Sequence, residues 1–179
     1  MKIIKSLIFI IFAIFLLYLI LLLYNGCEQH RREREFLDKY EYEDFSQFNN
    51  VHIFIRGGDR ESIDIMLNAP YFIKDTSRIG LYIVTLNRKS HQIIEGKWTL
   101  AEHHVEADTL KLQQLAQTFM KYKIPRLYVD TVGNVFIYLK DVETLSLVRF
   151  ANEDELQKRS REYTWKKVKN TDNWYKLKE

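Results

Sequence analysis

A run of eighteen uncharged residues, Leu7 to Tyr24 (LIFIIFAIFLLYLILLLY), most constrains what this chain can form. As a helix the run spans roughly 27 Å at ~1.5 Å per residue, close to the ~30 Å hydrocarbon core of a bilayer. A helix that is apolar on every side must be surrounded by protein if it is a core helix, and a chain of 179 residues offers little protein for that at its start. We therefore expect an N-terminal transmembrane helix.

Two kinds of anchor fit residues 1–27. Lys2 and Lys5 form the short basic region that secretory signals and signal anchors share, but the apolar run exceeds the ~7–15 residues of a cleaved signal. Cys27, the only cysteine, follows Gly26 just beyond the run, and this arrangement resembles the signal of a bacterial lipoprotein. The resemblance implies that Cys27 is lipidated and becomes the new N-terminus. We favour an uncleaved signal anchor and keep the lipid anchor as the alternative, since both tether the same domain.

The side of the membrane on which the C-terminal part lies is harder to predict, because basic residues stand on both sides of the apolar run. A first hydrophobic segment behind a short basic N-terminus is what the export machinery reads as a signal. We therefore expect an extracytoplasmic domain in a bacterial cell envelope.

The rest of the chain is nearly neutral. Two of the 27 basic side chains precede residue 28, which leaves 25 against 24 acidic ones. Proteins whose main task is to bind nucleic acid usually carry a strongly basic domain, so no nucleic-acid partner is expected. Aromatic residues make up 14% of the chain, with only two prolines and six glycines, which favours a sheet-rich folded core over a disordered stalk.

The sequence divides into an anchor (1–27), a charged juxtamembrane spacer helix (28–49) and one α+β globular domain (50–179) with an antiparallel sheet and one main packed helix. In the spacer, acidic residues interleave with basic ones and cancel most of the field of a lipid-binding patch, so we interpret it as a solvated helix.

Alternating apolar residues predict a first strand over 51–56, and Gly57-Gly58-Asp59 predicts a turn after it. The turn then leads into a short helix, Arg60 to Asn68, which we expect to end before Pro70. Further strands are expected at 71–73, at 79–86, which is apolar on both faces and so lies inside the sheet, and around 92–94.

The helix that starts at Thr109 has the clearest pattern. Leu112, Leu115, Ala116 and Phe119 fall on one face, Asp108 can cap the start, and Pro125 prevents continuation. After it, strands at 126–130, 135–139 and 142–150 predict an antiparallel meander, followed by a polar helix or turn over 152–162.

The tail, residues 163–179, interleaves aromatic residues with lysines. Trp165, Trp174 and Tyr175 are candidate binding residues, because such a pattern can stack on rings or lie on anionic lipid. The same pattern suits an edge hairpin, in which aromatic side chains face the core and lysines discourage further strand pairing. We favour the edge hairpin.

A dense group of possible metal ligands lies in the middle of the chain: Glu102, His103, His104, Glu106 and Asp108. Metal sites use such residues, but their spacing is not HExxH and no cysteine pair supports it. We interpret the stretch as a solvated acidic segment that leads into the helix, and we expect no metal and no cofactor.

Two classes of function follow. The first is a membrane-tethered extracytoplasmic binding or interaction module, such as an accessory or immunity-type protein with a protein partner. The alternative is a hydrolase or metal-dependent enzyme that uses the Glu102–Asp108 cluster. We favour the first, because the chain has no GxSxG motif and its histidines have no recognisable orienting partners.

Overall fold

The structure is a computed structural model, and it describes residues 2–69, 81–99 and 108–178. The backbone of residues 2–11, 13, 21–23 and 25 is described without their side chains. The chain divides into two units, residues 1–39 and residues 40–179, and each is described by itself.

The first unit is helical. Helix α1, Lys2–Tyr40, continues from the apolar run through the charged segment. In the charged part Arg32 pairs with Glu28 and Arg31 with Glu35, each one helical turn apart, with nitrogen–oxygen distances of 2.6 and 3.1 Å. Pairs at this spacing stabilise a helix. Glu33, Phe36 and Leu37 in the same stretch are buried, so only part of this segment faces solvent. Among the described residues no helix combines the length and the apolar character that a membrane crossing needs.

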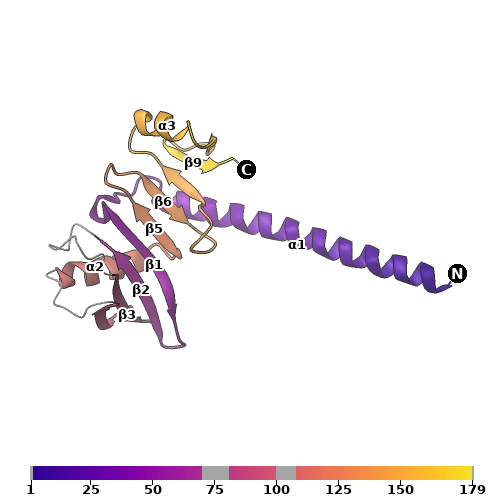
Figure 1. Cartoon of the computed structure of the whole chain (residues 1–179), viewed down its shortest axis with the longest axis horizontal. Helices are drawn as coiled ribbons and strands as arrows, with labels where there is room; N and C mark the ends of the chain where they lie inside the picture. Colours follow the sequence, from indigo (N-terminus) through magenta and orange to yellow (C-terminus); the bar gives the residue numbers. More distant parts are fainter. Residues whose placement is uncertain (1, 70–80, 100–107, 179) are drawn as a thin grey trace. The chain divides into compact units, whose positions relative to one another are not determined.

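In the residues that the structure describes, the second unit carries one nine-stranded antiparallel sheet, in the order β4-β3-β2-β1-β5-β6-β7-β9-β8 (Figure 1). Its described elements are η1 Ser46–Phe48, β1 Val51–Gly58, β2 Ser62–Asn68, β3 Tyr82–Asn87, β4 Ile93–Trp98, α2 Thr109–Met120, β5 Arg126–Val129, β6 Val135–Tyr138, β7 Leu147–Arg149, α3 Glu153–Arg159, β8 Trp165–Lys167 and β9 Trp174–Leu177. The α+β class with an antiparallel sheet is therefore confirmed.

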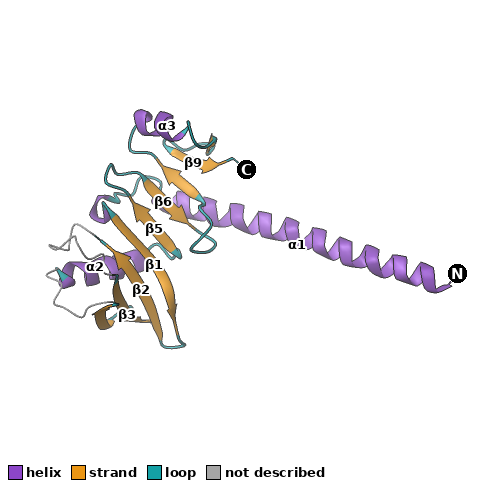
Figure 2. Cartoon of the chain, viewed as in Figure 1, coloured by secondary structure: helices purple, strands orange, loops and turns teal. Residues whose placement is uncertain are grey.

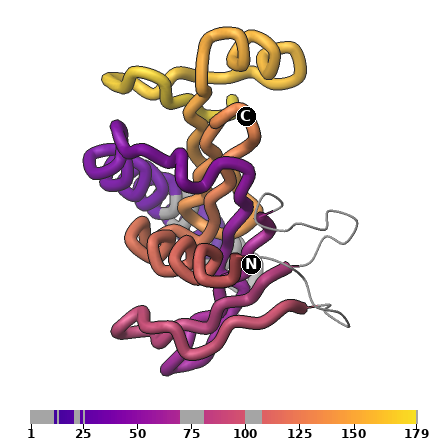
Figure 3. Tube along the Cα trace, turned by 90° about the vertical axis from the view of Figure 1, so that its left-hand side faces the viewer, coloured from indigo at the N-terminus to yellow at the C-terminus, as the bar shows by residue number. Residues whose placement is uncertain are grey.

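Helix α2 explains the strand order. The first four strands follow one another outward from β1 to the edge strand β4, and α2 then returns the chain so that β5 pairs with β1. The helix packs on β2, β3 and β4. Figure 3 shows α2 on one side of the strands.

The core lies between this helix and the sheet face that it covers. Alternate residues of the central strands point there and are buried, as Ile53, Ile65, Leu127 and Ile137 show. The predicted face of α2 is confirmed, because Leu112, Leu115, Ala116 and Phe119 are all buried. Asp108 caps the helix as expected, since its carboxylate accepts the backbone N–H of Lys111 at 2.9 Å.

The expected helix at Arg60–Asn68 is wrong, because this segment is strand β2, paired with β1 in a hairpin. The turn is built for a hairpin: Gly58 has φ +129°, and a Cβ there would overlap the carbonyl oxygen of Ser62. The Asp59 carboxylate accepts the backbone N–H of Ser62 at 2.7 Å, which closes a turn rather than a helix start. Ile63, Ile65 and Leu67 alternate along the buried face, and this period of two overrides the helical interpretation.

Most other expected elements are present. The strand at 79–86 is β3, inside the sheet as predicted, and the short strand near 92–94 is β4. The meander is β5, β6 and β7, although β7 is shorter than the predicted 142–150. The polar helix is α3, and the tail forms the hairpin β8–β9 with β8 at the sheet edge. The strand expected at 71–73 lies outside the described residues.

Candidate functional site

The sheet face opposite α2 is lined with aromatic and arginine side chains on the three strands β1, β5 and β6. Each of these side chains is half-exposed, whereas their neighbours along the strands mostly point into the core. We call this surface the open face and define it by His52, Phe54, Arg126, Tyr128, Phe136 and Tyr138. Figure 2 shows the three strands side by side.

Strand register brings these six residues together. His52 stands opposite Tyr128, and Phe54 opposite Arg126, in the β1–β5 pair. The β5–β6 pair then places Tyr128 opposite Phe136 and Arg126 opposite Tyr138. Because side chains alternate along a strand, one choice of register puts all six on the same face.

The rings of the open face form a continuous row across the three strands. The ring centroids of His52 and Tyr128 are 5.7 Å apart, and those of Tyr128 and Phe136 are 5.3 Å apart with nearly parallel planes. Phe54 extends the row along β1, with its centroid 5.3 Å from that of His52. These distances lie within the range at which aromatic pairs attract.

Two guanidinium groups lie over this row. Cζ of Arg126 is 4.3 Å from the ring centroid of Tyr138, and Cζ of Arg159, from α3, is 5.8 Å from that of Phe136. Nη1 of Arg126 donates to the backbone carbonyl of Val142 at 2.7 Å, and Nη2 of Arg159 pairs with Asp130 at 3.6 Å. Each guanidinium is therefore held in place by one of its terminal nitrogens.

Arg126 is the only arginine, lysine or acidic residue among the six that define the open face. Burial, with a smaller contribution from the positive charge of Arg126, lowers the pKa of His52 to about 4. Burial also raises the pKa of Tyr128, and the negative charge of Asp130 adds to this. Arg126 thus supplies the positive charge of the six residues, and Arg159 adds a second cation that is paired with Asp130.

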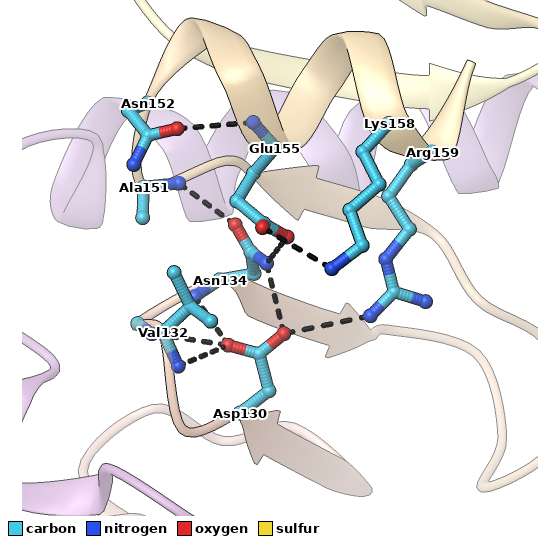
Figure 4. Close-up of polar contacts among 9 residues, drawn as sticks. Asp130, Val132, Asn134, Ala151, Asn152, Glu155, Lys158 and Arg159 are labelled. Atoms are coloured by element: carbon cyan, nitrogen blue, oxygen red, sulfur yellow. Dashed lines mark hydrogen bonds and ion pairs between the residues drawn. The ribbon is translucent and has the colours of Figure 1, made fainter. Parts of the chain in front are cut away.

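A buried polar network fastens the turn between β5 and β6 (Figure 4). Oδ1 of Asp130 accepts the backbone N–H groups of Val132, Gly133 and Asn134 at 2.9 to 3.0 Å. The other carboxylate oxygen of Asp130 accepts the Asn134 amide at 2.8 Å and faces Arg159. Both oxygens of Asp130 are therefore used within the fold.

The Asn134 side chain links the same turn to α3. Its Nδ2 also donates to Glu155 at 3.0 Å, and its Oδ1 accepts the backbone N–H of Ala151 at 2.9 Å (Figure 4). Asn134 is fully buried, so these bonds replace water. This network positions α3 and, through α3, the Arg159 side chain on the open face.

A cavity of about 390 Å³ lies near the other face, beside Arg149. Residues 41–45 join α1 to η1, and we call them the connector. The cavity is lined by the connector, by residues at the end of β7, by the β5–β6 turn and by the tail hairpin: Glu41, Tyr42, Gly133, Arg149, Phe150, Ala151, Asp172, Asn173 and Trp174. Nη1 of Arg149 donates to the backbone carbonyl of Glu43 at 2.8 Å, and Asp172 N donates to the Glu41 carboxylate at 3.2 Å. The lining groups thus hold the connector.

The structure separates the three predicted binding residues of the tail. Trp174 is fully buried and contacts Phe45, with ring centroids 6.5 Å apart. Trp165 and Tyr175 are half-exposed, and each lies edge-on to Phe150 at 5.3 and 5.4 Å. Packing against the domain therefore occupies much of all three side chains, as an edge hairpin requires.

Of the predicted ligand cluster, Glu102, His103, His104 and Glu106 lie outside the described residues. Asp108 is described, and its carboxylate caps α2. Among the described residues no group of three or more histidine, cysteine, aspartate or glutamate side chains could hold a metal ion. Cys27 is an exposed free thiol.

Sequence reasoning missed the open face, although a signal for it was present. In each of the segments VHIFIR, RLYV and VFIY the residues between the core positions are aromatic or basic instead of small and polar. An outward face that faces only water needs no such residues. Reading the outward positions of three adjacent strands together would have indicated a contact surface.

No protein family, curated protein or solved structure matches this chain.

Proposed function

We propose that this chain is a membrane-tethered interaction module whose domain lies outside the cytoplasm, in a bacterial cell envelope, and binds a protein partner through the open face. The observation that carries this proposal is the composition of that face. It presents four aromatic residues, a neutral histidine and an arginine, without a lysine, aspartate or glutamate among the six.

This composition is typical of contact surfaces between proteins. Tyrosine, phenylalanine and arginine are enriched at interfaces, and lysine and acidic residues are depleted from their centres. Tyrosine and arginine are also among the residues that most often supply binding energy when they are desolvated. The rings pack against one another and each guanidinium has a partner within the domain, so these side chains would lose less conformational entropy on binding than free ones.

The tether is supported by the apolar run in α1. The described side chains of that run are exposed, including Phe12, Phe15, Leu17 and Tyr18, each about 60% exposed. Such a continuous apolar surface is unfavourable in water and fits a lipid environment. The run of Leu7 to Tyr24 is long enough to cross a bilayer as a helix, and lipidation at Cys27 is the second way to hold the chain there.

The tether is tested by fractionation and by mass spectrometry of the N-terminus. We expect the full-length chain in the membrane fraction, starting at or near Met1. A chain that begins at a lipidated Cys27 would favour the lipid anchor and keep the tether. Recovery of the full-length chain in the soluble fraction would refute the tether.

The role of the open face is tested by crosslinking the full-length chain in its own membrane. We expect Tyr128→Ala and Phe136→Ala to abolish a crosslinked complex that Tyr163→Ala leaves intact. Tyr163 is the control, because it is an exposed aromatic residue outside the open face. Complexes that form equally well in all three variants would show that the partner binds elsewhere, provided each variant melts like the unaltered protein.

A further inference from the structure

We propose that the open face binds an extended acidic segment of the partner, with carboxylates at alternate positions that pair with Arg126 and Arg159. This inference rests on the proposed function and names the chemistry of the partner. It is carried by the placement of the two guanidiniums.

The two rings against which the cations lie belong to one strand. Arg159 lies over Phe136 and Arg126 lies over Tyr138, and these rings are two residues apart on the same face of β6. Two residues of a strand span about 7 Å. Carboxylates at positions i and i+2 of an extended peptide have the same separation as these two ring-bearing residues and also lie on one side of that peptide.

Each guanidinium still has donors to offer. One terminal nitrogen of each is held, Nη1 of Arg126 by a carbonyl and Nη2 of Arg159 by Asp130. In the described part of the chain the opposite terminal nitrogens, Nη2 of Arg126 and Nη1 of Arg159, have no hydrogen-bond partner, and they are not buried. A guanidinium that is held by one terminal nitrogen and exposes the other is preorganised to donate hydrogen bonds to a carboxylate.

Within the described part of the domain Arg126 has no acidic partner, and Arg159 has one, Asp130. Asp130 is the acidic group beside Arg159, and its two oxygens already accept four hydrogen bonds. Moreover, Nε of Arg126 and Nε of Arg159 are both buried, with no hydrogen-bond partner among the described residues. A carboxylate placed against each guanidinium would offset the cost of holding these partly desolvated cations.

The chemistry favours a peptide over a single-stranded nucleic acid. Aromatic rings with arginines can also stack bases, but proteins that do this add a positively charged groove that follows the backbone. Beyond the anchor this chain has 25 basic and 24 acidic side chains, so it lacks the excess charge for that. Two fixed cations beside apolar rings fit a short segment in which acidic and apolar residues alternate.

The test uses labelled peptides and the full-length protein in a non-ionic detergent, with binding followed by fluorescence anisotropy. The probe is a peptide with three alternating Glu-Val pairs. Its controls are a peptide of the same composition with the glutamates in one block, a Gln-Val version, and an oligodeoxythymidine of similar length. We expect the alternating peptide to bind about tenfold more tightly than the Gln-Val version, the scale of one charge-assisted contact, and more weakly as salt increases.

Substitutions then locate the site. Arg159→Gln should remove most of the preference for glutamate over glutamine, whereas Arg161→Gln should leave it unchanged, because Arg161 is an exposed arginine outside the open face. Arg126→Lys should weaken binding but retain part of it, because lysine keeps the positive charge and loses the paired N–H donors of the guanidinium. This substitution also serves as the second variant if Arg159→Gln does not fold. Equal binding of the Gln-Val peptide, tighter binding of the oligonucleotide, or no effect of either arginine substitution would overturn the inference.

The outcome is separable from that of the proposed function. If Tyr128→Ala and Phe136→Ala abolish the crosslinked complex but no acidic peptide binds, the open face is the interaction surface and the inference that it binds an acidic segment is wrong. If those substitutions leave the complex intact, the partner does not bind through the open face, and both the proposed function and this inference are wrong.

Discussion

The indole Nε1 of Trp174 donates a hydrogen bond to the backbone carbonyl of Glu41, with 3.1 Å between nitrogen and oxygen. Arg149 reaches the same carbonyl at 3.4 Å, and its guanidinium lies 5.1 Å from the ring centroid of Phe45 and 5.5 Å from that of Trp174. The tail hairpin therefore does more than close the edge of the sheet. It also holds the connector, the segment that follows α1 in the chain.

The first prediction follows from this contact. Trp174→Ala should lower the free energy of unfolding by roughly 3–5 kcal/mol, because it removes a large buried side chain and leaves the Glu41 carbonyl without this donor. Trp165→Ala should cost clearly less, because Trp165 is half-exposed. Urea unfolding of the full-length protein in detergent, followed by circular dichroism, measures both. Equal losses would contradict the different burial of the two residues.

Helix α2 gives a second prediction. Phe119→Ala should destabilise the domain by roughly 3–5 kcal/mol, because Phe119 is fully buried on the face that covers the sheet. Gln114→Ala is the matched control on the exposed face of the same helix and should change stability by less than ~0.5 kcal/mol. A similar loss in both variants, measured by thermal unfolding, would mean that the buried face of α2 is misplaced.

Local patterns with one consistent period predicted most of the fold. The 3.6-residue spacing of α2 with its aspartate cap, and the alternation in β1, β5 and β6, each indicate one structure. Residues 60–68 were misjudged because Asp59 can cap a helix or close a turn, and only pairing with β1 decides between them. A partner strand acts through tertiary contacts, which local propensity does not contain.

The candidate site was harder to predict than the fold. Trp165, Trp174 and Tyr175 attracted attention because aromatic residues and lysines interleave in the tail, yet the register of the hairpin turns Trp174 fully inward. The open face, in contrast, is assembled from strands that are far apart in the chain, since His52 and Phe136 are 84 positions apart. Arg159 joins them from α3, which the Asn134 side chain links to the β5–β6 turn through Glu155. Sequence alone gives neither register nor docking.

Asn134 gives a third prediction. Asn134→Ala should cost roughly 2–4 kcal/mol, since the buried Asp130 carboxylate and the Ala151 N–H lose hydrogen bonds that water does not easily replace. Asn152→Ala, which removes the N-terminal cap of α3, should cost only about 1 kcal/mol because that position is exposed. Chemical denaturation compares the two. If Asn134→Ala were no more harmful than the loss of the cap, the network would not be what fastens α3.

The last prediction concerns pH and His52. The imidazole has a pKa near 6.5 in an unfolded chain, and burial together with Arg126 lowers this pKa to about 4 in the folded domain. Between these two values the unfolded state binds more protons than the folded state, so stability that is present above pH ~6.5 is lost as the pH falls toward 4. Arg126 is the charged group that faces the ring, while Phe54, Tyr128 and Asn68 are its uncharged neighbours.

Because His52 is partly exposed, screening reduces the effect, and we expect a loss on the order of 1 kcal/mol. The measurement is the free energy of unfolding of the full-length protein in detergent at pH 7.5, 6 and 4.5, compared with that of His52→Gln. The difference between the two proteins should shift in favour of the variant as the pH falls, because glutamine cannot take up the proton. His91→Asn controls for the loss of a histidine elsewhere in the domain. A difference that stays constant from pH 7.5 to 4.5 would show that folding does not lower the pKa of His52, and the open face would then gain a further positive charge as the pH falls below about 6.5.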